Sequence, residues 1–204
     1  MMPEILIRKS CLIMSVGLSI LLAGCGSGSG SSSTTSSTVV AAAVAPSPPA
    51  RAALALSYMP QLESQWCWAA VTQMVLAYNR NTVSQSQIAS HEFGVNDNFP
   101  ATAGQIQTEL NYFSGGSINA QISTGPLSFD QIVDKISHNI PIIVQYEYVA
   151  DKTGHFAVIY GYDEGGNLLM DDPFYGQLTV PYRDANPYLP PGGEIMVWRF
   201  TIVG

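Results

Sequence analysis

One cysteine stands apart from the other two in this sequence. The chain of 204 residues contains three cysteines, and Cys11 and Cys25 both belong to an N-terminal targeting segment. Cys67 therefore has no disulfide partner in the folded part, and an unpaired thiol in an exported protein is either buried and inert or chemically active. Residues 69–78 (AAVTQMVLAY) predict a buried helix, with Ser64 as its N-cap. The first turn of a helix favours the thiolate, which is the nucleophilic form of cysteine.

Three histidines are candidates for the base that a thiol nucleophile needs. His91 lies in the polar helical stretch 84–93, and His138 ends the stretch 128–139. Both are expected to have structural roles, because a cation suits the C-terminal end of a helix. His155 follows a polar loop and opens the apolar run FAVIYGY, which predicts a buried strand with an imidazole at its edge. His155 is therefore the predicted base.

The residues around Cys67, QLESQWCWAA, resemble the active-site helix of papain-like cysteine peptidases. They are most similar to the bacterial branch with a WCWAA core, alongside the double-glycine bacteriocin-processing peptidases. The resemblance implies that Cys67 is the nucleophile and that Gln61, six positions earlier, supplies a side-chain N–H to the oxyanion hole. Gln65 is the rival glutamine, although its spacing differs from the family pattern. One oxyanion donor contributes roughly 10²–10³ in rate.

Two further segments resemble strands of the same superfamily. GHFAVIYGY is similar to the strand that carries the catalytic histidine, here His155, and NLLMDDPFYG is similar to the strand that carries the third catalytic residue. The resemblance implies that Asp172, just before a proline, orients the imidazole. Asp171 is the alternative. Successive residues of a strand face opposite sides, so only one of the two carboxylates can reach His155.

These residues predict a peptidase with a Cys-His-Asp triad and a glutamine in the oxyanion hole. Cys67 attacks the carbonyl carbon, His155 takes the thiol proton and later protonates the leaving amine, and Asp172 steadies the imidazolium. The same groups can also serve acyl transfer, transglutamination or deamidation, because the acyl-enzyme step is shared. A non-catalytic surface lipoprotein that uses this fold as a binding module is the hypothesis from a different class.

The remaining pattern supplies the elements that position these residues. Helices precede strands, which favours an α+β fold with an antiparallel sheet rather than alternating βαβ units. The resemblance makes it a papain-like fold, with a helical part packed on the sheet and the active site in the cleft between them. Trp66, Trp68 and Trp198 are expected in the core or the cleft wall. Helices are predicted near 65–79, 84–93, 102–113 and 128–139, and strands near 140–149, 156–163, 167–172, 176–182 and 194–203.

The N-terminal segment resembles a bacterial lipoprotein signal. Two basic residues precede an apolar run over 11–22, which ends in the LAGC box. The resemblance implies removal of residues 1–24, lipid on Cys25 and, with glycine in the next position, the outer membrane of a Gram-negative cell envelope. Residues 25–50 are rich in Ser, Thr and Pro and predict a flexible tether. Residues 51–204 are the predicted peptidase domain.

Composition and charge exclude some functions. The chain is 47% apolar and 11% charged, with a net charge of −7, and its eight basic residues are scattered. This leaves enough apolar residues for a packed core and no basic patch for nucleic acid. No CxxC, HExxH or phosphate-loop motif is present, so we expect no metal and no cofactor. The expected partners are a peptide or protein substrate and, through the lipid, a membrane, with the protein itself a monomer.

Overall fold

The computed structural model describes residues 48–204. The predicted signal peptide, Cys25 and most of the predicted tether lie outside these residues. Within the described part, none of the helices combines the length and apolar character needed to cross a membrane. The elements in chain order are β1 (Ala52–Ala53), α1 (Cys67–Tyr78), α2 (Gln85–Phe93), α3 (Ala103–Phe113), β2 (Gln121–Thr124), α4 (Phe129–Ser137), β3 (Ile142–Tyr148), β4 (Gly154–Tyr162), β5 (Asn167–Asp172), β6 (Gly176–Pro181), the 3₁₀ turn η1 (Tyr182–Asp184) and β7 (Met196–Val203).

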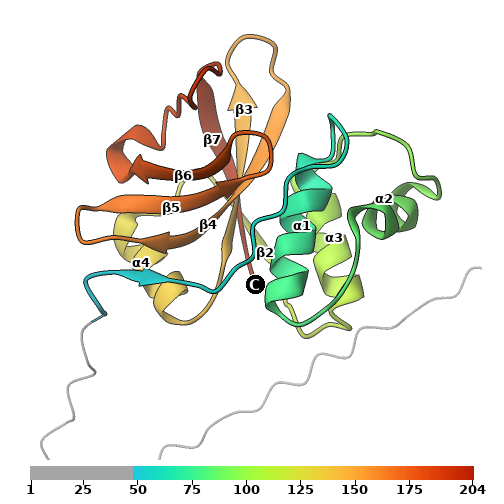
Figure 1. Cartoon of the computed structure of the whole chain (residues 1–204), viewed down its shortest axis with the longest axis horizontal. Helices are drawn as coiled ribbons and strands as arrows, with labels where there is room; N and C mark the ends of the chain where they lie inside the picture. Colours follow the sequence, from blue (N-terminus) through green and yellow to red (C-terminus); the bar gives the residue numbers. More distant parts are fainter. Residues whose placement is uncertain (1–47) are drawn as a thin grey trace, which may run out of the picture. The chain divides into compact units, whose positions relative to one another are not determined.

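The strands form one seven-stranded sheet in the order β2-β7-β3-β4-β5-β6, with β1 paired to β4 (Figure 1). Every pairing is antiparallel. The consecutive strands β3 to β6 are neighbours, as expected for short hairpin connections. The predicted α+β fold with an antiparallel sheet is therefore confirmed.

Apolar side chains cover both faces of the sheet, because successive strand residues alternate between the faces. On β3, Ile143 packs with α1, α2 and α3, whereas its neighbours Ile142 and Val144 belong to a second core. That second core contains Ile132 and Ile136 of α4. Figure 1 shows α1, α2 and α3 grouped beside the sheet, with α4 apart from them. The three tryptophans are buried in these cores, as predicted.

Two strands and one helix position differ from the predicted arrangement. The sequence gives no signal for β1, which has only two residues, or for β2, whose four residues are all exposed and lack apolar alternation. The helix α4 follows β2, so helices and strands interleave at this point instead of forming two separate blocks. The hydroxyl of Tyr162 donates to the carbonyl of Pro49 at 2.8 Å, which fixes the start of the described chain against β4.

The helix α1 is the only α-helix of residues 48–204 that begins without a side-chain cap. The other three begin with a capping box, in which a Ser or Thr and a Gln three residues later satisfy each other's backbone N–H groups. The predicted N-cap Ser64 is wrong: the N-cap is Trp66, which makes no side-chain cap bond. The N–H of Trp66 donates to the carbonyl of Glu63, so a separate turn precedes the helix. The first-turn N–H groups of α1 are therefore left uncapped by the chain.

Candidate active site

Cys67 is the first residue of α1, and the loop after α2 fixes this end of the helix. The N–H of Gln65 donates to the side chain of Asn98 at 2.8 Å, and the amide of Asn98 donates to the hydroxyl of Ser64 at 2.8 Å. The indole N–H groups of Trp66 and Trp68 donate to backbone carbonyls of the same loop at 3.1 and 3.0 Å. The position of the cysteine thus depends on contacts across more than thirty residues of chain.

Gln85 fixes the segment that leads into this turn. Its side-chain oxygen accepts from the N–H of Leu62 at 3.0 Å, and its amide donates to the carbonyl of Pro60 at 2.9 Å. The side chain is 2% exposed, which is unusual for a glutamine on a polar helix. Neither Gln85 nor Asn98 was identified from the sequence, because no local pattern marks them.

His155 and Asp172 form a buried pair. His155 is the second residue of β4, and its Nε2 lies 2.9 Å from both carboxylate oxygens of Asp172 at the end of β5. The backbone N–H groups of Phe174 and Tyr175 also donate to Asp172 Oδ1, each at 2.9 Å. Asp172 is fully buried and His155 is 5% exposed. The turn between β5 and β6 therefore holds the carboxylate, and the carboxylate fixes the imidazole.

Asp171, the alternative partner, does not contact His155. It is fully buried, and its Oδ1 accepts from the amide of Gln177 at 3.0 Å. Burial raises the pKa of Asp171, and the bond from Gln177 lowers it by a smaller amount. Adjacent residues of a strand point to opposite faces of the sheet, which is the reason that only Asp172 reaches the imidazole.

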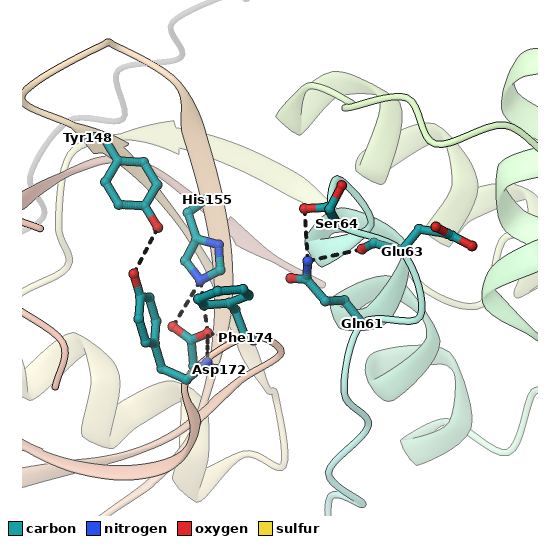
Figure 2. A network of polar contacts seen from close by, with 8 residues as sticks. Gln61, Glu63, Ser64, Tyr148, His155, Asp172 and Phe174 are labelled. Atoms are coloured by element: carbon teal, nitrogen blue, oxygen red, sulfur yellow. Dashed lines mark hydrogen bonds and ion pairs between the residues drawn. The ribbon is translucent and has the colours of Figure 1, made fainter. Parts of the chain in front are cut away.

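The surroundings of His155 favour the imidazolium. Burial by itself lowers the pKa of His155, but the hydrogen bond that it donates to Asp172, together with its interaction with Cys67, outweighs burial and raises the pKa to about 10. Figure 2 shows one ring nitrogen of His155 directed at Asp172 and the other turned toward the segment that carries Gln61 and Ser64. Because Nε2 is occupied by Asp172, Nδ1 is the nitrogen available to Cys67.

Three of the four predicted active-site residues line one cavity of about 250 Å³. Cys67, His155 and Gln61 all line it, and Cys67 is only 8% exposed, at the border of the helical core. A second cavity of about 340 Å³ shares part of this lining and extends it toward residues 192–194. The residues common to both are Tyr148, Asp151, Thr153 and Phe174. The larger pocket of about 430 Å³ beside β6 contains none of the predicted residues.

Gln61 borders the cavity in an arrangement that differs from a free oxyanion donor. Its amide nitrogen donates to the carbonyls of Glu63 and Ser64 at 3.0 and 2.9 Å (Figure 2). Its side-chain oxygen is buried without a hydrogen-bond partner. Its backbone N–H donates to the carbonyl of Pro173 at 3.1 Å, which joins this segment to the turn after β5. The rival Gln65 lines the same cavity.

The other two histidines lie elsewhere. His91 is in the last turn of α2 and pairs with the buried Glu109 of α3 at 2.8 Å. His138 is the C-cap of α4 and contacts the carbonyl of Asp134 at 2.8 Å. Their predicted positions at helix ends are confirmed. No group of three or more potential metal-ligating side chains occurs among residues 48–204.

Solved structures of peptidases resemble this one, among them the following two. The peptidase domain of Streptococcus ComA, a bifunctional ABC transporter involved in quorum sensing, has a TM-score of 0.54 and 16% sequence identity over 73% of this chain and 98% of that chain. A double glycine motif protease from an AMS/PCAT transporter, solved in complex with the leader peptide, has a TM-score of 0.49 and 17% identity over 72% of this chain and 94% of that chain. The likeness to the ComA domain confirms the predicted peptidase fold.

Sequence comparison leads to the same group of proteins. No curated protein matches this chain in sequence. Residues 53–188, however, match the Peptidase_C39 like family, a stretch that contains all four predicted active-site residues. Because the match covers more than half of its length, the chain belongs to the Peptidase_C39 like family of cysteine peptidases.

Proposed function

We propose that this protein hydrolyses peptide bonds through Cys67, His155 and Asp172. The observation that carries the proposal is the orientation of His155. Nε2 is held by a fully buried carboxylate, and Nδ1 is left for a cavity that Cys67 lines. A base oriented by a third group is one part of the geometry that an activated nucleophile requires, and this part supports the proposal.

The reaction follows from the protonation states that the site favours. The Cys67 thiolate attacks the carbonyl carbon of the substrate, and a bond forms between sulfur and carbon. The imidazolium of His155 donates its Nδ1 proton to the leaving amine, and the carbon–nitrogen bond breaks. A water molecule then gives a proton back to His155 and attacks the acyl carbon, releasing the acid and the thiolate. Asp172 remains ionised throughout and stabilises the imidazolium.

The oxyanion would be stabilised at the start of α1. Among the described residues no acceptor faces the backbone N–H of Cys67, and the positive end of the helix dipole lies there. Gln61 is the second proposed donor, because its amide borders the same cavity. It would have to redirect one N–H from the carbonyl of Ser64 to the oxyanion, a change of the kind expected when a substrate binds.

The shape of the cleft supports an extended peptide as substrate. The two cavities share four lining residues, so they lie side by side and together mark a path from Cys67 past Phe174 to residues 192–194. A peptide lying along this path would place its scissile bond at the sulfur and several flanking residues against the sheet side.

The test uses the purified protein without residues 1–24 and a mixture of peptides, with mass spectrometry as the readout. We expect new termini with the wild type and none with Cys67→Ala, and we expect iodoacetamide at pH 6 to alkylate Cys67 faster than free cysteine. An alkylation rate equal to that of free cysteine would remove the activated thiolate and with it the proposal. Products that carry an added amine acceptor would identify acyl transfer instead of hydrolysis.

We also propose that lipid on Cys25 anchors the protein in the cell envelope. The support is the LAGC box and the apolar run before it. Stable anchoring by acyl chains needs more than one chain, as a lipoprotein N-terminus would supply. We expect cells fed an alkyne-labelled fatty acid to label the wild-type protein and Cys11→Ser, but not Cys25→Ser. Label on Cys25→Ser would contradict the anchor without touching the peptidase proposal.

A further inference from the structure

We propose that the hydrogen-bonded tyrosines Tyr148 and Tyr175 are positioning residues, which exclude water from the His155–Asp172 pair and hold it in line with Cys67. This inference rests on the proposed function, since it assigns a role within the same site. Tyr148 and Tyr175 do not touch the reacting atoms, so their effect is exerted through His155.

The two tyrosines meet beside the imidazole. Tyr148 is the last residue of β3, and Tyr175 lies in the turn between β5 and β6. Their hydroxyl groups are 3.2 Å apart. The centroid of the Tyr148 ring lies 6.2 Å from the centroid of the His155 ring. The ring of Tyr175 is edge-on to the imidazole, with 5.8 Å between the two centroids. Figure 2 shows Tyr148 and its hydroxyl bond beside His155, on the side away from Gln61.

The hydrogen-bonded pair of Tyr148 and Tyr175, the tyrosine bridge, accounts for the burial of His155 beside an open cleft. His155 lines the cavity and is nevertheless 5% exposed. The carboxylate of Asp172 accepts from His155 and from the backbone N–H groups of Phe174 and Tyr175, and neither tyrosine hydroxyl bonds to it. Burial, followed by the bond to Tyr175, raises the pKa of Tyr148, so Tyr148 stays neutral at ordinary pH. In such low-dielectric surroundings the bond between imidazolium and carboxylate is stronger than it would be in water.

The loop before β7 fixes Tyr175 from outside. A Cβ atom added at Gly193 would lie 2.6 Å from the hydroxyl of Tyr175 and 2.5 Å from the ring of Pro190. Real Cβ atoms do not approach other atoms so closely, so this position accepts only glycine as long as Tyr175 stays in place. The loop therefore touches the tyrosine bridge at its hydroxyl end, and a larger residue there would displace it.

The backbone and the ring of Tyr175 have separable roles. The backbone N–H donates to Asp172 Oδ1 at 2.9 Å whatever the side chain is. Substitution of the side chain therefore leaves this hydrogen bond to the carboxylate intact. It removes only the part of Tyr175 that excludes water from the His155–Asp172 pair. Tyr175→Phe removes the hydroxyl bond and keeps the ring, whereas Tyr175→Ala removes both.

The first test is the exchange of the ring N–H of His155 with water, observed by proton NMR in the full mature protein. A proton held between an imidazolium and a buried carboxylate gives a separate low-field signal. In Tyr175→Ala we expect its exchange to become faster by at least about tenfold, as local access to water increases. Tyr148→Phe and Tyr175→Phe should each have a smaller effect in the same direction, and Gly193→Ala should resemble Tyr175→Ala. This measurement needs no substrate, so it tests the role of the tyrosines independently of peptidase activity.

Kinetics provide the second readout. We expect Tyr175→Ala to lower kcat by about tenfold to a hundredfold, because small displacements of reacting groups have effects of this size. Tyr112→Ala is the matched control, since Tyr112 is 58% exposed on α3 and lies outside the cleft. If Tyr175→Ala does not fold, the two phenylalanine variants decide the matter. Wild-type exchange rates in both of them, or in a folded Tyr175→Ala, would overturn the inference even in an active peptidase.

Discussion

Asp171 and Asp172 are adjacent on β5, yet their carboxyl groups meet different surroundings. Asp172 bonds to His155, whereas Asp171 faces Gln177 on the neighbouring strand. Both side chains are fully buried, so an isosteric Asp→Asn change preserves the packing at either position. The two side chains therefore form a natural pair for separating catalysis from stability.

We expect Asp172→Asn to lower kcat/KM by about a hundredfold or more, because an amide cannot stabilise the imidazolium and favours the wrong tautomer. Asp171→Asn should lower it by less than about threefold, since its carboxyl does not reach His155. Steady-state kinetics on one peptide substrate measure both. Equal losses in the two variants would mean that Asp172 acts through the fold alone.

The raised pKa of His155 predicts how stability depends on pH. In the folded protein this pKa is about 10, against 6.5 for an ordinary histidine, so the folded state keeps a proton that the unfolded state loses. The stabilisation is complete below about pH 6.5 and disappears as the pH rises through 10. Urea unfolding at pH 7, 8 and 9 should therefore give a free energy of unfolding that falls with pH. Asp172→Asn should give a flatter dependence over the same range, and an unchanged slope would contradict this origin.

The start of α1 differs from the starts of the other helices because it relies on a distant loop. Ser64 and Gln65 both bond to Asn98, which lies in the loop after α2. In the proposed mechanism, a side-chain cap would occupy first-turn N–H groups that the oxyanion needs, whereas support from the distant loop leaves them open.

We expect Asn98→Ala to lower kcat/KM by about tenfold while changing the free energy of unfolding by only about 1 kcal/mol, the value of an ordinary hydrogen bond. Asn96→Ala, an exposed change in the same loop, should have the activity of the wild type. Kinetics and urea unfolding of the two variants provide the measurement. A loss of stability in Asn98→Ala that fully explains its loss of activity would contradict a role in holding the nucleophile.

The molecule as a whole is acidic, with a net charge of −7, and the cleft shares this character. Asp151 and Glu194 line the second cavity, and no Lys or Arg lines either cavity among residues 48–204. Bonds from Thr153 lower the pKa of Asp151, which keeps it ionised. Nearby cations are already engaged, since Arg199 and Lys152 both pair with Glu147. Clefts lined by one sign of charge attract substrates of the opposite sign.

We therefore expect a peptide with Lys near the scissile bond to be cleaved about two- to fivefold faster than its Glu counterpart at low salt, with the difference shrinking at high salt. The double variant Asp151→Asn, Glu194→Gln should remove most of this preference. Glu164→Gln, on the turn between β4 and β5, changes the charge outside the cleft and should retain it. Competition between the two peptides, followed by mass spectrometry, measures the ratio. If the double variant kept the preference for the lysine peptide, the preference would have to come from another part of the cleft.

Local sequence patterns predicted much of the fold. Helical patterns in the sequence predicted the four α-helices, and apolar runs predicted five of the seven strands, because these signals depend on neighbours a few residues apart. The strands β1 and β2 were missed, because one is too short and the other too exposed to leave a pattern. Capping chemistry misplaced the start of α1, where Ser64 belongs to a turn of its own.

The chemistry of this protein was present in its sequence as residue types: one unpaired cysteine, one histidine opening a buried strand and two aspartates at the end of the next strand. Only the folded chain decided which aspartate meets the imidazole, which distant side chains hold the nucleophile and which tyrosines cover the pair. Those contacts join residues far apart in the chain, so they depend on strand register and on the packing of helices against the sheet. Neither quantity is encoded in any short stretch of sequence.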